Sequence, residues 1–206
     1  MSQPARNAPQ LTENLLGAVD IMLGRERGLE RIDISERGFL WSFSALILVL
    51  LIDMPALSLM YDHISQTAVS ISSKPVYMFG KLLAAAVAYV AAMVALYLLC
   101  RSPKEQFRFP GCVIVHNWAA PTVSIAVLPI AMLNIAAAPD HLPGSDGSGW
   151  VFVFLALMAI FVLIGVRIIR ITLDSSLSRA CLYFAVSTMV SLVVSYGLEG
   201  LMGLTS

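Results

Sequence analysis

Two ionisable side chains inside long apolar segments are the strongest candidates for chemistry in this sequence. Asp53 lies within an apolar stretch over 39–61, and Lys81 lies within the next stretch, over 75–100. At about 1.5 Å per helical residue, Asp53 is about 21 Å into the first helix and Lys81 is about 9 Å into the second. In a hydrocarbon layer about 30 Å thick, antiparallel helices bring these two depths together. Because an unpaired charge there is costly, we predict an intramembrane ion pair between Asp53 and Lys81.

The alternative is that these two side chains do not meet. Lys81 can extend toward the outer water layer while its methylene stem stays in apolar surroundings, and Asp53 can face water or a neighbouring backbone. Intramembrane ionisable residues are also typical of ion and proton pathways, so the pair is the main reason to consider a transport function.

A second set of polar residues falls at the ends of two later apolar stretches. His116 and Asn117 lie near the start of the third, and Arg167 and Arg170 lie three residues apart near the end of the fourth. Together these side chains could hold a phosphate or a lipid headgroup. The alternative is ordinary interfacial anchoring, in which arginines reach the headgroup layer without a specific ligand.

The sequence gives no sign of a metal centre, a cofactor or a catalytic site. The doublets Asp62-His63 and Asp140-His141 match no metal-ligand spacing, and we expect no metal there. No Walker loop, HExxH or GxSxG motif is present. Basic residues are few and close to the apolar stretches, which argues against nucleic-acid binding. We therefore expect a protein that is not an enzyme and carries no cofactor.

The elements that position these residues are five apolar stretches long enough to cross a bilayer as helices. Of the 206 residues 58% are hydrophobic and only 13% are charged, about half the charge of a typical soluble domain. The predicted fold is an all-α bundle of five transmembrane helices. The predicted spans are 39–61, 75–100, 111–138, 150–173 and 180–204.

Basic residues gather at alternate ends of these spans. Eleven of the 13 lie before the first span, between the second and third, or around the turn between the fourth and fifth, and only Lys74 and Lys81 lie elsewhere. Basic residues are retained on the cytoplasmic side. We expect an integral protein of a bacterial inner membrane, with its N-terminus in the cytoplasm and its C-terminus in the periplasm.

The segment 1–38 is predicted to be a cytoplasmic tail that contains one amphipathic helix over 11–23. Its apolar residues fall on one helical face, and Glu13, Gly17 and Asp20 fall on the opposite face. Such a helix can lie on the membrane surface or dock on the bundle, and the pattern does not decide between these positions.

Small residues at four-residue spacing mark two helix faces that can pack closely. Such stripes let helix backbones approach within a bilayer, where no hydrophobic force drives association. We expect them to pack helices of this chain, and they are also the faces through which a protein partner or a second copy could bind. The stripes are Gly80, Ala84, Ala88 and Ala92, and then Ser187, Ser191 and Ser195.

Two short stretches carry a family resemblance. Residues 27–35, followed by 38–43 at the start of the first span, and residues 115–119 with Leu128-Pro129, resemble uncharacterised bacterial five-span inner-membrane proteins and, more distantly, the Yip family. The resemblance implies five spans, a cytoplasmic N-terminal segment and no catalysis. The Gly-Pro motif of the Yip trafficking proteins is missing here, so their binding of small GTPases is not implied.

The function that the sequence favours is a multi-pass membrane scaffold or accessory subunit that organises protein partners or lipids. Short loops, packing stripes and an amphipathic tail support it. The alternative is a small transporter or channel subunit that uses Asp53 and Lys81. A third hypothesis, a lipid-modifying enzyme around His116 and Arg167, lacks a nucleophile with an oriented base.

Overall fold

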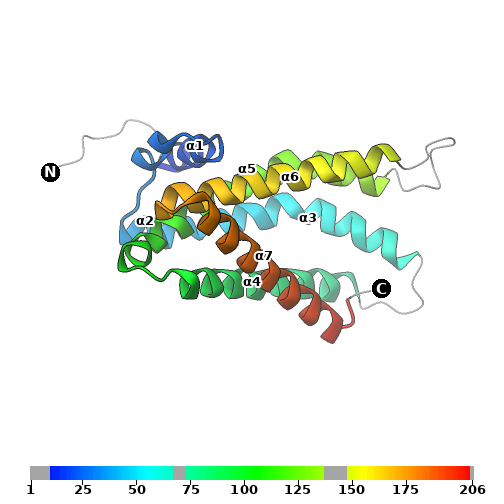
Figure 1. Ribbon diagram of the computed structural model, residues 1–206. Helices are drawn as coiled ribbons and strands as arrows, with labels where there is room; N and C mark the ends of the chain where they lie inside the picture. The colour runs from blue at the N-terminus through cyan, green and yellow to red at the C-terminus, as the bar shows by residue number, and fades with distance from the viewer. Residues whose placement is uncertain (1–9, 67–72, 137–147, 205–206) are drawn as a thin grey trace.

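The computed structural model describes residues 10–66, 73–136 and 148–204, and the described chain is helical almost throughout (Figure 1). Five helices or helix pairs are long and apolar enough to cross a membrane. This confirms the predicted number of spans and the all-α class. The elements are α1 (Gln10–Met22), η1 (Glu26–Glu30), α2 (Glu36–Ser42), α3 (Ser44–Ser65), α4 (Lys74–Leu99), α5 (Pro103–Ala136), α6 (Ser148–Leu173) and α7 (Leu177–Leu201).

Large apolar side chains cover the outside of the bundle instead of filling its interior. Leu98 of α4 and Phe152 of α6 are 73% and 72% exposed, and at most two fifths of any span is buried within the chain. A water-soluble protein does not expose apolar surface on this scale. The chain is therefore an integral membrane protein whose helices contact lipid.

The long helices run antiparallel in chain order, so the loops alternate between two ends of the bundle (Figure 1). We call the end that carries α1, η1, α2 and the α6–α7 turn the capped end, and the other the distal end. α4 packs along α7, and α5 packs against both α3 and α6. The end of α7 lies at the distal end, far from α1.

The first and third spans differ most from the prediction. The first span is divided at Phe43, where the hydroxyls of Ser42 and Ser44 donate to backbone carbonyls three residues earlier. Such side-chain bonds compete with regular helix geometry. The third span begins at Pro103 rather than at residue 111, so Pro110 lies inside a helix instead of starting one. The last two residues of that predicted span, 137–138, lie outside the described residues.

The early start of α5 has a local cause in a capping box. The Ser102 hydroxyl accepts a hydrogen bond from the Glu105 amide, and the Glu105 carboxylate accepts one from the Ser102 amide. Pro103 occupies the first helical position, where its fixed φ and missing N–H are tolerated. The sequence Ser-Pro-Lys-Glu thus sets the start of this helix.

The N-terminal helix docks on the bundle. α1 packs against α5, α6 and η1, and its Ala18 and Ile21 are fully buried. Its buried face differs from the predicted one, because Gly17 and Asp20 are also buried. The 3₁₀ helix η1 covers the side of α1 that we expected to face water.

A contact between two glycines brings α1 and η1 together. A Cβ atom added to Gly28 would lie 2.4 Å from the carbonyl oxygen of Gly17 and 2.8 Å from Ile21. No side chain fits at that distance from a backbone atom, so this approach requires glycine at position 28. We call α1 and η1, held together in this way, the cap.

A buried carboxylate organises the charges of the cap. Asp20 is 7% exposed and lies 3.1 Å from Arg25, 3.5 Å from Arg31 and 3.7 Å from Arg27. The hydrogen bond from Arg25 and the charges of Arg27 and Arg31 lower the pKa of Asp20 below its usual value. Oppositely charged side chains of the cap therefore form ion pairs within the chain and are not simply solvated.

The lowered pKa of Asp20 predicts a pH dependence for the packing of η1 against α1 within the cap. A carboxyl group with a lowered folded-state pKa stabilises the fold above its unfolded pKa, and that stabilisation is lost as pH falls through the folded pKa. The stability of the cap should be constant from about pH 8 to pH 5 and decrease below about pH 4. Hydrogen exchange of the α1 amides, corrected for intrinsic rates, measures this. The Asp20→Asn variant should lose the acid step, and an unchanged step would show that another group causes it.

Candidate functional site

Lys81 forms an ion pair, but its partner is Glu199 of α7 and not Asp53. The Lys81 Nζ atom lies 2.7 Å from Glu199 Oε2, and the two side chains are only 14% and 13% exposed. The Ser195 hydroxyl donates to the other Glu199 oxygen at 3.2 Å. The predicted Asp53–Lys81 pair is therefore corrected: the close packing of α4 on α7 places Glu199 nearer to Lys81 than α3 places Asp53.

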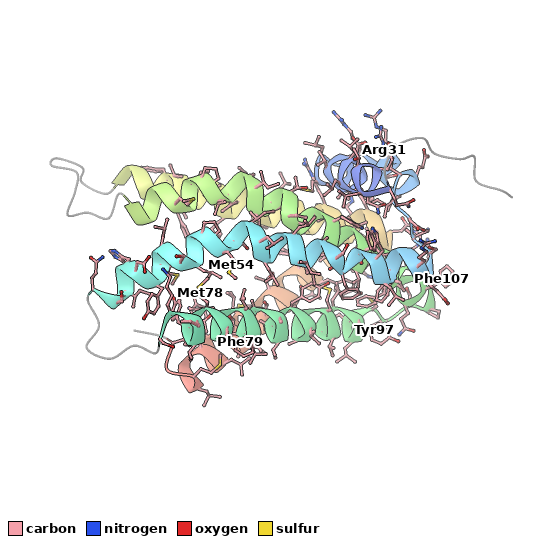
Figure 2. All side chains as sticks on the ribbon, turned by 180° about the vertical axis from the view of Figure 1, so that it is seen from behind. Arg31, Met54, Met78, Phe79, Tyr97 and Phe107 are labelled. Carbon is pink, nitrogen blue, oxygen red and sulfur yellow. The ribbon has the colours of Figure 1, made fainter. Side chains whose placement is uncertain are left out.

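Asp53 faces α5 instead. Its Oδ2 atom accepts a hydrogen bond from Ser124 at 3.4 Å, and no cation of the described chain lies within ion-pair distance of it. The side chains of Met54 and Met78 lie in the region between α3 and α4 (Figure 2). The two intramembrane charges that the sequence singled out thus have separate environments.

Both small-residue stripes are used within the chain. Gly80 is buried, and a Cβ atom there would lie 2.6 Å from Leu204, which follows α7. Ala84, Ala88 and Ala92 are at most 8% exposed. Ser187, Ser191 and Ser195 of α7 line a cavity together with Ala88 and Ala92. That α4 face is already occupied by α7, and any role for these stripes in binding a partner stays a prediction.

Asn117 is the centre of a polar chain that joins three helices. It is fully buried, accepts a hydrogen bond from the Tyr89 hydroxyl and donates one to Ser42 Oγ at 2.8 Å. The Ser42 hydroxyl donates in turn to the Phe39 carbonyl at 2.7 Å. Asn117 therefore satisfies side chains of α2 and α4, and it is not available to a headgroup.

His116 faces a cavity between α4, α5, α6 and α7. Its ring stacks on Tyr89 at 5.9 Å between centroids, and no hydrogen bond joins it to another residue of the described chain. The cavity has a volume of about 370 Å³ and is also lined by the hydroxyl groups of Thr188 and Ser191. Polar groups that face a cavity inside a membrane domain can hold water or a small polar solute.

Arg167 and Arg170 lie in a different place from His116. They line a cavity of about 710 Å³ at the capped end, together with Arg108 and Ser175. The Arg167 guanidinium donates to the Met22 carbonyl at 3.1 Å, which ties α6 to α1. The expected cradle of His116, Asn117, Arg167 and Arg170 therefore does not assemble, because His116 lines the inner cavity and Asn117 is sealed between helices.

Arg108 is the member of this basic cavity that the sequence analysis missed. Its guanidinium lies 3.2 Å from Asp174, which also binds Lys104 at 2.6 Å. Both cations lower the pKa of Asp174, with the Lys104 hydrogen bond as the largest cause. The positive φ of 51° at Asp174 ends α6 and turns its side chain toward α5. Only the early start of α5 places Arg108 on a helix beside these groups.

Glu105 is a further buried carboxylate that the sequence analysis did not select. It is 3% exposed and accepts hydrogen bonds from Arg179 and Tyr183 of α7, each at 3.3 Å. It joins the start of α5 to α7 and so closes the capped end. Its position in a capping box was the signal that could have identified it.

The possible metal ligands are dispersed in the described ranges. Asp62 binds Lys74 at 2.8 Å across the distal end. Among the residues that the structure describes, no three His, Cys, Asp or Glu side chains converge. Asp140 and His141 lie outside the described residues.

The buried position of the Lys81–Glu199 pair predicts a large coupling energy. Removing one partner of a buried pair leaves an uncompensated charge, so Lys81→Met or Glu199→Gln alone should cost about 3 kcal/mol of unfolding free energy. The double variant should cost less than the sum by at least about 1 kcal/mol. The exposed Lys74–Asp62 pair is the control, with an expected coupling below about 1 kcal/mol. Denaturation in detergent micelles measures both. Coupling between Lys81→Met and Asp53→Asn instead would restore the original pairing.

The chain through Asn117 gives a second stability prediction. Asn117→Ala removes both hydrogen bonds and leaves a cavity, so we expect a loss of about 2 kcal/mol. Tyr89→Phe removes one bond and leaves the Asn117 oxygen unpaired, for a loss of about 1 kcal/mol. Thermal unfolding of the purified variants measures both. An additive double variant would contradict the bond between these two residues.

Comparison with known proteins supplies no relative from which a function can be transferred. No protein-family model matches the chain, and neither a curated protein nor a solved structure matches it. The function has to be derived from the contacts described above.

Proposed function

We propose that this protein is a non-enzymatic membrane scaffold or accessory subunit that organises lipids or protein partners at the capped end. The supporting observation is the docked cap. α1 is packed onto α5 and α6 by a buried core of Ala18, Ile21 and Leu173, and η1 is packed against α1. A segment fixed in this way presents a defined surface at the end of the membrane domain, which is what a scaffold requires.

The charge distribution supports an orientation for this surface. The basic residues of α5, α6 and α7 that lie near helix ends, Lys104, Arg170 and Arg179 among them, all lie at the capped end. Basic residues are retained in the cytoplasm, so the proposal places the cap there and the end of α7 on the opposite side. The membrane we propose is a bacterial inner membrane.

The experiment compares the proteins and lipids that co-purify with three forms of the chain from native membranes in mild detergent. Gly28→Ala should push η1 away from α1 and so disrupt the cap, because its Cβ atom would lie 2.4 Å from the Gly17 carbonyl oxygen. Gly197→Ala is the control, since nothing lies within 4 Å of its added Cβ atom. Overpacking costs about 1–3 kcal/mol, so partners held by the cap should fall about tenfold in Gly28→Ala only.

Two results would overturn the proposal. One is a wild-type sample with no protein or lipid enriched above control membranes. The other is a Gly28→Ala sample with its cap released, as shown by trypsin cleavage at Arg25 or Arg27, that retains the full partner set. The Gly197→Ala control separates both results from general damage to the bundle.

The second candidate function is a small transporter or channel subunit. The observation that favours it is the cavity beside His116, where hydroxyl groups of α7 face an imidazole inside the membrane domain. Ser195 continues this polar lining to the Lys81–Glu199 pair. Asp53 lies apart from this route. Proton or ion flux into liposomes that is lost in His116→Ala would support transport over the scaffold, and flux equal to that of empty liposomes would exclude it.

A further inference from the structure

The basic cavity at the capped end continues into an apolar cleft. The cleft has a volume of about 970 Å³ and lies between η1, α2 and the first turns of α5. Leu29 and Arg108 line both spaces, and Thr172 in the cleft neighbours Ile171 in the basic cavity. The cleft wall is mainly apolar and includes Phe39, Leu40 and Phe107, with Glu36 among its polar residues. A polar and an apolar compartment therefore share one boundary.

The charge in the basic cavity is not balanced within the chain. Arg108, Arg167 and Arg170 face Glu26 and Asp174, and Asp174 is already shared with Lys104. In the described ranges neither Arg167 nor Arg170 has a carboxylate within ion-pair distance. Arg170 is exposed, so its guanidinium is free to bind an anion.

A hydroxyl group in the same cavity also lacks a partner. Ser175 Oγ is buried and makes no hydrogen bond with the described chain. A buried polar atom without a partner is uncommon in folded proteins, so this hydroxyl can bind a water or a ligand group that enters the cavity. Ser175 and the arginines line one cavity, so one anionic ligand can satisfy all of them.

The position of the two compartments, at the membrane boundary, indicates which kind of ligand they bind. The basic cavity is formed by the last turns of α6, and the cleft by α2 and the first turns of α5, where two spans reach the membrane boundary. Figure 2 places Phe107 at this end, and its side chain is 88% exposed. Basic pockets at such positions bind the headgroups of anionic lipids, and an apolar cleft beside them fits an acyl chain.

We infer that this composite site binds an anionic phospholipid, with its phosphate at Arg108, Arg167, Arg170 and Ser175 and an acyl chain in the cleft. The inference rests on the proposed function and names the lipid class that the scaffold organises. Asp174 limits access of the phosphate to Arg108, so Arg167 and Arg170 provide most of the attraction. The other explanation is that the two arginines only stabilise the negative carboxyl end of α6.

The test uses purified full-length protein and measures retention of phosphatidylglycerol against phosphatidylcholine by native mass spectrometry. The wild type should prefer phosphatidylglycerol. The phosphatidylglycerol preference of the double variant Arg167→Gln/Arg170→Gln should fall about twenty-five-fold, since each basic residue contributes about fivefold near anionic lipid. Arg101→Gln is the matched control, because Arg101 is exposed at the same end but lines neither compartment. An unchanged preference in the double variant would overturn the inference and leave the helix-end explanation.

A second arm separates a lipid from a soluble anion. A Cβ atom on Gly111 meets only Ile34, at 3.9 Å, so Gly111→Leu should fill the cleft without disturbing the arginines. We expect this variant to lose phosphatidylglycerol and keep the wild-type melting temperature, with Gly111→Ala as a check on folding. If inorganic phosphate protects the wild type as well as the lipid does and Gly111→Leu has no effect, the site binds a soluble anion. A wild-type protein that shows no preference for phosphatidylglycerol but still retains its protein partners would reject this inference alone and leave the scaffold proposal intact.

Discussion

Most polar side chains that enter this bundle are paired inside it, and this requirement explains many of the contacts between helices. Lipid offers no hydrogen bonds, so an unpaired group in the membrane domain carries its full desolvation cost. Lys81 meets Glu199, Asn117 meets Tyr89, and Glu105 meets Arg179. The first and third pairs join helices that are not consecutive, α4 to α7 and α5 to α7, and the second joins the consecutive helices α4 and α5. The polar residues therefore fix which helix lies beside which, while the apolar surface fixes only that the helices stay in the membrane.

The same constraint separates what the sequence could predict from what it could not. Apolar length and the alternation of basic residues are local properties, so the number of spans and their order followed from them directly. Partner choice is not local. The predicted depths of Asp53 and Lys81 are similar, but depth does not say which helix lies beside α4. The Ser191 and Ala88 stripes carried that information, because helices with small residues can approach closely. Combining stripe and depth would have placed Glu199 beside Lys81.

The structure of the capped end was harder to predict from the sequence than the membrane-spanning part of the bundle. Short-range backbone contacts determine where the helices of the capped end begin and how closely they pack. Ser102 and Glu105 start α5 eight residues before the apolar pattern does, and this early start brings Arg108 to the basic cavity. Gly28 could be recognised as a glycine but not as the point where two backbones touch. Trp118 is of a residue type that is common at membrane interfaces, yet it is fully buried. Composition identifies a residue type that suits an interface, whereas only the packing decides whether the residue reaches it.

The cap and the basic cavity depend on each other physically. Arg167 is held at the cavity by the Met22 carbonyl, and Leu23 and Gly24, which follow α1, line the same space. The cap itself is held by Asp20, whose arginine partners are different from those of the cavity. A ligand that binds Arg167 and Arg170 therefore contacts the element that the Asp20 cluster keeps in place. Ligand binding and cap docking are linked equilibria. If the ligand stabilises the docked cap by a given free energy, the docked cap must increase the affinity for the ligand by the same free energy.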